Sequence, residues 1–421
     1  MAYTALDAMH LVGMDSRPTL VLAPLRVARD TWPDEAMKWK HLRDITVSDI
    51  VGSAKERREG LKREAMVYTT NYESIPWLIE QCGDKWPFGA VIADESTRIK
   101  SFRLRQGGKR AKALSKVAWG GVNRWMNLTG TPAPNGLQDL WGQNWFIDQG
   151  QRLGRTYSGF SQRWFHTDHT GFGTKPFKHA QTEIQDLLRD VSLTLDPKDW
   201  FDLQAPIVTE VPVYLPLEAM QMYKQFEKTM FAELKCGAEL EVFNAAAKTN
   251  KCLQIANGCI YHEDGQKGIH DEKLEALESL VEELNVPVLV AYAFVSDMER
   301  IKKKFGKRCA LISKPAGMEA FISGAAQIGL AHPASMGHGV DGLQKITNIL
   351  IRFGRDWSLE NQMQMAERIG PVRQMQAGFD RPVLIYDIVA KGTIDEDVIA
   401  RHESKREVQD ILLAAMKRLE L

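Results

Sequence analysis

The stretch Ala90-Val-Ile-Ala-Asp94-Glu95-Ser-Thr97 decides the fold of this chain. A short apolar run that ends in two adjacent carboxylates predicts a buried strand of an α/β sheet. Ligands of open α/β sheets bind at the carboxyl ends of the strands, so Asp94 and Glu95 are expected at the functional edge. In nucleotide hydrolases the first acid of such a pair holds Mg²⁺ and the second orients or deprotonates the attacking water. The alternative is an ordinary strand whose polar end leaves the core.

The composition is ordinary for a protein large enough for two or more domains, with 421 residues of which 44% are hydrophobic and 26% charged. No apolar run approaches membrane-spanning length and no secretory leader is evident, so we expect a cytoplasmic protein with no membrane partner. The five cysteines include no CxxC pair, and the irregular spacing of Cys252, Cys259, His262 and His270 disfavours a metal cluster. Because the formal net charge is zero, any surface that binds nucleic acid must be local.

Strands and helices alternate along the first half of the chain, which predicts a doubly wound parallel sheet. The expected strands cover residues 19–23, 66–73, 90–94 and 125–128, and the expected helices cover residues 2–12, 32–39 and 75–81. In the second half, apolar runs at residues 286–291, 310–312, 348–353 and 383–390 predict further strands between helices.

Four short motifs occur in order in the first half: Leu22-Ala-Pro24, Thr70-Asn-Tyr-Glu73, Asp94-Glu-Ser-Thr97 and Leu128-Thr-Gly-Thr-Pro132. Together they resemble motifs Ia, Ib, II and III of superfamily-two helicases of the Swi/Snf type. The run Ala23-Pro-Leu-Arg-Val-Ala-Arg29, with tryptophans downstream, is similar to the short bacteriophage members of that family. The resemblance covers nearly the whole chain and implies two RecA-like lobes with helical insertions.

Thr129 and Thr131 follow the expected strand at residues 125–128. Their hydroxyls would lie near the acid pair, where they would sense the γ-phosphate and relay its loss to bound DNA. The alternative is a plain strand-to-helix turn.

The segment Arg98–Lys116 is rich in basic residues and almost free of acidic ones, and Gly107-Gly108 lies in its middle. Because phosphate neutralisation supplies most non-specific affinity for DNA, we expect backbone contacts from this segment. The residues assigned to this role are Arg98, Lys100, Lys109 and Arg110. A solvated basic loop is the alternative.

Motif V of the family resembles residues 327–344, in which Gly337 and Gly339 would let backbone N–H groups approach a phosphate and Ser335 would contact DNA. Motif VI resembles the helix that opens at residue 357, in which the resemblance implies that Gln364 contacts the nucleotide and that Arg368 and Arg373 reach the γ-phosphate. The two arginines are five residues apart rather than the usual three, and Pro371 between them predicts that Arg373 lies in a loop. Ordinary surface arginines are the alternative.

We expect three parts: a first lobe over residues 1–205 with a helical insertion from about residue 150, a connector and helical segment over 206–270, and a second lobe over 271–421. The insertion at residues 150–177 carries aromatic residues between basic ones, which predicts either base stacking or core packing. The proline-rich run 195–216 is typical of a connector.

A helicase of this type binds ATP through a phosphate loop, GxxxxGK[ST], and the 421 residues contain no such run. In relatives the loop directly precedes a helix similar to residues 2–9, so we expect a chain that is short of this loop and impaired in ATP binding. The resemblance implies a bacteriophage ATP-dependent helicase or double-stranded-DNA translocase that uses ATP and Mg²⁺ in the host cytoplasm. Two alternatives remain: a catalytically silent DNA-binding or scaffolding protein, and one half of a split enzyme whose phosphate loop comes from another polypeptide.

Overall fold

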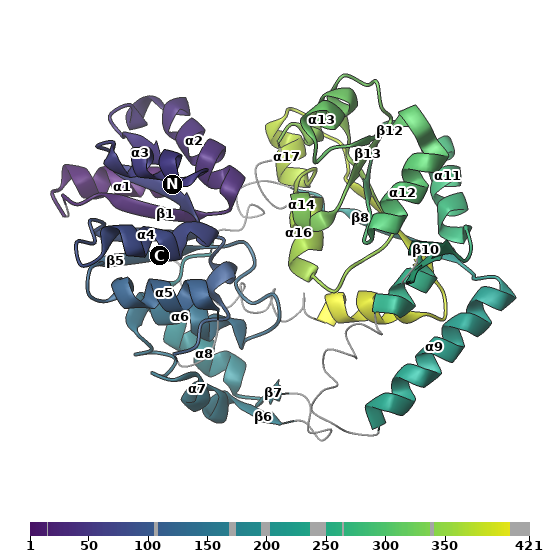
Figure 1. Cartoon of the computed structure of the whole chain (residues 1–421), viewed down its shortest axis with the longest axis horizontal. Helices are drawn as coiled ribbons and strands as arrows, with labels where there is room; N and C mark the ends of the chain where they lie inside the picture. Colours follow the sequence, from purple (N-terminus) through teal and green to yellow (C-terminus); the bar gives the residue numbers. More distant parts are fainter. Residues whose placement is uncertain are drawn as a thin grey trace. The chain divides into compact units, whose positions relative to one another are not determined.

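The computed structural model describes residues 1–14, 16–104, 108–167, 174–194, 203–235, 250–262, 265–336 and 341–404. These residues form two compact units, one within Met1–Leu195 and one within Asp196–Ser404 (Figure 1). Each unit is built on its own sheet.

A five-stranded sheet with the strand order β2-β3-β1-β4-β5 forms the first unit. All its strand pairs are parallel. The strands are β1 (Thr19–Ala23), β2 (Val47–Asp49), β3 (Val67–Asn71), β4 (Ala90–Asp94) and β5 (Arg124–Leu128). The sequence did not predict β2, because three residues are too few to show a period of two.

Helices cover both faces of this sheet. They are α1 (Ala2–Leu11), α2 (Trp32–Lys38), α3 (Ala54–Lys62), α4 (Ile75–Cys82), α5 (Lys109–Ala118), α6 (Asp139–Asp148), α7 (Tyr157–Trp164) and α8 (Ala180–Leu188), with short helical turns at η1 (Val27–Thr31), η2 (Lys40–Leu42), η3 (Tyr72–Ser74), η4 (Ser96–Ile99) and η5 (Arg189–Val191). Successive residues of a strand point to opposite faces. Leu20 and Leu22 of β1 therefore pack with α4, α5 and α6, whereas Val21 and Ala23 pack with α1 and α2.

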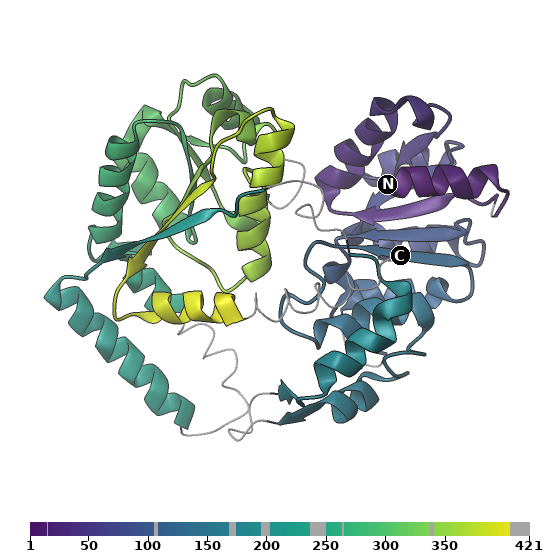
Figure 2. The same cartoon turned by 180° about the vertical axis from the view of Figure 1, so that it is seen from behind.

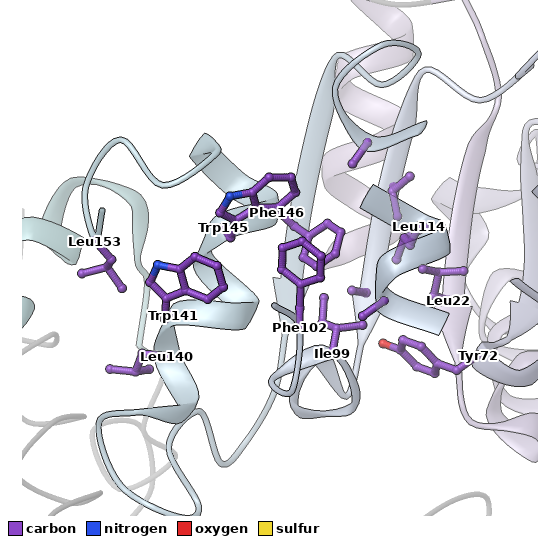
Figure 3. Close-up of a cluster of buried hydrophobic side chains, with 14 of the residues drawn as sticks. Leu22, Tyr72, Ile99, Phe102, Leu114, Leu140, Trp141, Trp145, Phe146 and Leu153 are labelled. Atoms are coloured by element: carbon purple, nitrogen blue, oxygen red, sulfur yellow. The ribbon is translucent and has the colours of Figure 1, made fainter. Parts of the chain in front are cut away.

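The aromatic residues of α6 and α7 form one end of the first core. Phe102 stacks on Trp141 with ring centroids 5.9 Å apart, and Trp145 and Phe146 close around it (Figure 3). Phe160 of the predicted insertion is fully buried in the same cluster. Trp164 and Phe165 are buried there too, so these aromatic side chains pack in the core instead of stacking on bases. Phe172, also in the insertion, lies outside the described residues.

A six-stranded sheet with the order β12-β13-β11-β14-β15-β8 forms the second unit, and its strand pairs are parallel as well. Its strands are β8 (Ile207–Val213), β11 (Val288–Ala291), β12 (Cys309–Leu311), β13 (Ile328–Ala331), β14 (Ile349–Arg352) and β15 (Leu384–Ala390). Its helices are α9 (Leu217–Lys235), α11 (Glu272–Leu284), α12 (Val295–Phe305), α13 (Pro315–Ile322), α14 (Pro333–Met336), α15 (Leu343–Ile346), α16 (Leu359–Glu367) and α17 (Pro371–Gln376), with the turn η7 (Gly306–Arg308) and helical residues at 250–256 and 394–404. Two short antiparallel hairpins complete the described strands: β6 (Phe165–Thr167) with β7 (Thr174–Pro176) in the first unit, and β9 (Cys259–His262) with β10 (Gly265–Gly268) in the second.

Residues 207–213, which the prolines placed in a connector, instead form the edge strand β8 (Figure 2). It pairs with β15 along its full length, from Ile207 opposite Leu384 to Val213 opposite Ala390. Pro212 lies within β8, and an edge strand tolerates a proline because one row of its N–H groups has no ladder partner. The β9–β10 hairpin also lies within residues 206–270, which were expected to form a connector and a helical segment.

The predicted fold class is confirmed: the chain contains two doubly wound parallel sheets, each flanked by helices. β1 and β4 are neighbours in the first sheet, and the chain leaves them in opposite directions. From β1 it continues to β2 at one edge of the sheet, and from β4 it continues to β5 at the other edge. The carboxyl ends of β1 and β4 therefore flank the position at which such sheets bind ligands.

Candidate functional site

Asp94 is the last residue of β4, and two aromatic side chains hold it in place. The indole Nε1 of Trp32 donates a hydrogen bond of 2.9 Å to Oδ2 of Asp94, and the Tyr72 hydroxyl donates one of 2.8 Å to its backbone carbonyl. Burial raises the pKa of the Asp94 carboxyl, and the hydrogen bond from Trp32 opposes that rise. The carboxylate is thus oriented by a neutral donor.

Glu95 adopts a left-handed backbone conformation, with φ 58° and ψ 56°. Among the described non-glycine residues, only Gln149 and Asn285 share a positive φ, and both follow the end of a helix, where this conformation is common. Glu95 instead follows a strand directly. Strained backbone of this kind is retained where the surrounding structure imposes it, and it concentrates at functional sites.

A cavity of about 400 Å³ lies beside Asp94, near the start of α1. Its walls come from α1, η1, α2, η2 and the end of β4, and its lining residues are Met1, Ala2, Tyr3, Thr4, Val27, Thr31, Trp32, Glu35, Trp39, His41, Leu42 and Asp94. Asp94, the predicted metal ligand, therefore borders a cavity of the size that small ligands fill.

The residues at this site fit Mg²⁺ better than they fit a triphosphate. No group of three or more metal-ligating side chains occurs among the described residues. Mg²⁺ does not need one, because it is commonly held by one or two carboxylates, with water and substrate phosphates as its other ligands. Asp94 supplies such a carboxylate. For the triphosphate the chain lacks the GxxxxGK[ST] run that would supply backbone amides and a lysine.

Thr129 and Thr131 lie at the same edge of the sheet as the acid pair. The register of β4 and β5 places Leu128 opposite Asp94, so Thr129 follows directly beyond that pair. The Thr129 hydroxyl accepts a hydrogen bond of 3.1 Å from the backbone N–H of Thr131, whose side chain is buried. The turn therefore holds both threonines close to the end of β4.

Gln143 of α6 connects the loops that follow β4 and β5, and the sequence analysis did not single it out. Its Oε1 accepts a hydrogen bond of 2.7 Å from the Ser96 hydroxyl, and its Nε2 donates one of 2.7 Å to the Pro132 carbonyl. The backbone carbonyl of Gln143 also accepts a bond of 3.0 Å from Asn127 of β5. The only sequence signal was a glutamine within a helix of otherwise mostly core-forming residues.

Most of the predicted DNA-contacting residues have partners within the first unit. Arg110 and Arg98 approach Glu73 at 2.9 and 3.9 Å. Lys100 lies 3.5 Å from Asp139. Lys109 is exposed at the start of α5, so this part of the basic segment is a helix and not the solvated loop of the alternative.

The predicted arginines of the second unit lie on either side of a helix break. Arg368 follows the end of α16 and donates a hydrogen bond of 2.9 Å from Nε to the Met336 carbonyl. Arg373 lies in α17 and forms an ion pair of 2.8 Å with Asp341. The expectation that Arg373 lies in a loop is wrong, because Pro371 occupies the first turn of a new helix, where its missing N–H costs nothing.

The remaining predicted residues of the second unit belong to the neighbouring segments. Gln364 is half-buried on α16. Ser335 lies in α14, where its hydroxyl donates a hydrogen bond of 2.7 Å to the His332 carbonyl. Gly337 and Gly339 lie outside the described residues.

Two parallel sheets of this topology define a protein with two RecA-like lobes, the first of which carries an acid pair at its carboxyl edge. The SNF2-related domain family matches residues 4–264, more than half of the chain. The chain belongs to this family.

Individual relatives agree with that assignment. Protein p41 of Acyrthosiphon pisum secondary endosymbiont phage 1 is 53% identical over 425 residues, covering 99% of this chain and 92% of p41. An uncharacterized ATP-dependent helicase of Mycoplasma genitalium is 24% identical over 416 residues, which cover 93% of this chain but only 37% of that protein. The predicted resemblance to bacteriophage proteins of the Swi/Snf type is confirmed.

Among solved structures, the Sulfolobus solfataricus SWI2/SNF2 ATPase core in complex with double-stranded DNA is similar at a TM-score of 0.41. The two chains are 19% identical, and the match covers 99% of this chain and 86% of that one.

Within the described parts of the chain, no helix has both the length and the apolar character needed to cross a bilayer.

Proposed function

We propose that this chain is the motor of a bacteriophage ATP-dependent helicase or translocase that acts on double-stranded DNA in the host cytoplasm. One observation carries the proposal: β4 ends at Asp94 beside a cavity, at the switch point of the sheet, and the strained Glu95 follows directly. Membership of the SNF2-related family supports ATP hydrolysis as the reaction. The phage relative supports the bacteriophage assignment, and the helicase relative supports the choice of nucleic acid as the partner.

The proposal gives each predicted residue a role. In the first lobe, Asp94 binds Mg²⁺, Glu95 orients the attacking water, and Thr129 and Thr131 relay the state of the γ-phosphate. In the second lobe, Arg368 and Arg373 stabilise the charge that develops on the transferred phosphoryl group. The backbone at Gly337 and Gly339 and the amide of Gln364 contact the nucleotide, and the predicted DNA contacts are Ser335, Arg98, Lys100, Lys109 and Arg110.

We further propose that the 421-residue chain alone binds ATP weakly, because it has no GxxxxGK[ST] run. The same observation favours a second candidate function: a catalytically silent DNA-binding or scaffolding protein. It is also consistent with an enzyme whose phosphate loop is supplied by another polypeptide.

DNA-stimulated ATP hydrolysis tests these proposals. We expect little hydrolysis from the 421 residues alone, and DNA-dependent hydrolysis from the same chain preceded by a segment that ends in a G-x-G-K-[ST] run. In that extended chain, Glu95→Gln should abolish hydrolysis while ATP binding remains. Glu80→Gln, on the exposed surface of α4, is the matched control and should leave the rate unchanged.

Two results would count against the enzyme. If Glu95→Gln left hydrolysis in the extended chain unchanged, the roles of the acid pair would be wrong. If neither chain hydrolysed ATP but both bound DNA, the silent function would be favoured.

A further inference from the structure

Helix α5 has one apolar and one cationic face. Ala111, Leu114 and Ala118 are buried, and Leu114 points into the core of the first unit (Figure 3). Lys109, Lys112 and Lys116 are exposed at the spacing i, i+3 and i+7, which places them along one side of the helix. We call these three residues the α5 lysine face.

The other described cations of this segment are used within the fold. Arg98 and Arg110 approach Glu73, and Lys100 approaches Asp139. The guanidinium of Arg103 packs 3.4 Å from the centroid of the Tyr157 ring. No ion pair joins the α5 lysine face to a carboxylate among the residues that the structure describes, although α4, which packs against α5, exposes Glu80.

The position of Lys109 and Lys112 is unfavourable for the helix itself, whereas Lys116 lies in its last turn, where the dipole favours a cation. Lys109, Arg110 and Lys112 occupy the first turn of α5, which contains no acidic residue and has no side-chain cap. The amino end of a helix carries partial positive charge, so cations there are disfavoured and anions are attracted. The sequence from Ser96 to Gln138 contains no aspartate or glutamate to offset the charge.

Helix α12 shows the opposite arrangement. Its lysines, Lys302, Lys303 and Lys304, lie in the last turn, where the helix dipole favours them. Lys304 also pairs with Glu278 at 2.6 Å. Stability of the fold accounts for the lysines of α12 but not for Lys109 and Lys112 of α5.

We infer that the α5 lysine face binds consecutive phosphates of one strand of duplex DNA, an assignment that rests on the proposed function. Seven residues of helix separate Lys109 from Lys116, which is about 10 Å along the axis. One strand of B-DNA carries a phosphate about every 3.4 Å of axial rise, and neighbouring phosphates lie farther apart than this because the strand winds around the axis, so the length matches about two or three phosphates. Lys112 and Lys116 are thereby added to the predicted DNA contacts, which already include Lys109.

Salt-dependent DNA binding by the full chain tests the inference. The α5 variant is Lys109→Gln/Lys112→Gln/Lys116→Gln. The control, called the α12 variant, is Lys302→Gln/Lys303→Gln/Lys307→Gln. It removes the same number of positive charges from exposed residues of α12 and η7. Affinity for a labelled duplex of about 20 base pairs is measured by fluorescence anisotropy between about 50 and 200 mM KCl. The measured quantity is the slope of log K for DNA binding against log salt concentration. Relative to wild type, we expect the magnitude of this slope to fall by about 2 to 3 in the α5 variant and by less than about 1 in the α12 variant.

A third variant, with arginine at all three α5 positions, should retain the wild-type slope because it keeps the charge. Equal slope losses in the α5 and α12 variants would overturn the inference. Polyglutamate, an anionic polymer without phosphates, serves as a second ligand. An α5 variant that lost polyglutamate binding but kept DNA binding would also overturn the inference. Absence of salt-dependent DNA binding by the wild-type chain would instead refute the proposed function. Unchanged thermal unfolding would confirm that these exposed substitutions leave the fold intact.

Discussion

The indole of Trp32 donates its N–H to Oδ2 of Asp94 at 2.9 Å, although 62 positions separate the two residues in the sequence. Burial raises the pKa of Asp94 and this hydrogen bond opposes the rise, so the bond favours the ionised carboxylate, which is the form that binds a cation. We therefore expect Trp32→Phe to raise the pKa of Asp94 further and to weaken Mg²⁺ binding near neutral pH. Carboxyl ¹³C chemical shifts recorded across a pH titration measure the effect.

Trp39→Phe is the control for this prediction, because the Trp39 indole donates to Glu35 at 3.2 Å instead. An Asp94 titration that is the same in Trp32→Phe and wild type would contradict the orienting role of Trp32.

Glu95→Gly should separate stability from activity. Glycine reaches a φ of 58° without the steric cost that glutamate bears, so the free energy of unfolding should rise by about 1 kcal/mol. The proposed hydrolysis should be lost, because the carboxylate is removed. Gln149→Gly, at a φ of 56° after α6, should also stabilise the protein but leave hydrolysis unaffected. Denaturant unfolding and ATPase assays of the extended chain check both outcomes, and a destabilised Glu95→Gly variant would refute the strain.

Gln143→Leu should destabilise the first unit by about 2 kcal/mol, because the Ser96 hydroxyl and the Pro132 carbonyl would lose their partner in a buried site. We also expect faster amide hydrogen exchange at residues 129–132, since the turn after β5 would no longer be attached to α6. Gln138→Leu, at a position preceding α6, is the matched control. Unchanged exchange at residues 129–132 in Gln143→Leu would show that the bridge does not position this turn.

Asp297 should make the stability of the second unit depend on pH. Burial raises its pKa from 3.8 to about 6. Because the folded state holds the proton more tightly than the unfolded state, stability should fall as the pH rises from about 4 to 6, by about 3 kcal/mol. Asp297→Asn keeps an oxygen to accept from the Phe294 N–H at 2.9 Å and should remove this pH dependence. Denaturant unfolding at pH values from about 4 to 7 measures it, and equal slopes in both proteins would contradict the prediction.

Lys273→Met should cost the second unit about 3 to 5 kcal/mol, because it leaves a buried carboxylate without its partner. Lys273 is 1% exposed, and its Nζ lies 2.5 Å from Oδ2 of Asp395 and donates a hydrogen bond of 2.8 Å to the side-chain Oδ1 of Asn257. Adding Asp395→Asn to Lys273→Met should recover much of the loss, since no unpaired charge then remains. A double variant as unstable as the single one, measured by thermal unfolding, would argue against the ion pair as the cause.

Helices and strands that repeat a simple apolar pattern were predictable. The strands at residues 19–23 and 90–94 and the helix of residues 75–81 could be read from local sequence, because each buries a regular apolar face. Elements without such a pattern were not predictable. β2 is too short, β8 carries a proline that only an edge position tolerates, and α17 starts at the proline that was expected to end regular structure.

The candidate site divides in the same way. The identity of the acid pair and its place after a strand follow from the sequence alone, because a polar end after an apolar run is a local property. Which side chains meet that pair was decided by the tertiary structure. Trp32 reaches Asp94, and Gln143 reaches Ser96 across 47 positions, because parallel strands bring their carboxyl ends and following loops to one edge. Sequence periodicity determines which face of an element is buried, whereas only the packed fold determines which buried polar groups become partners.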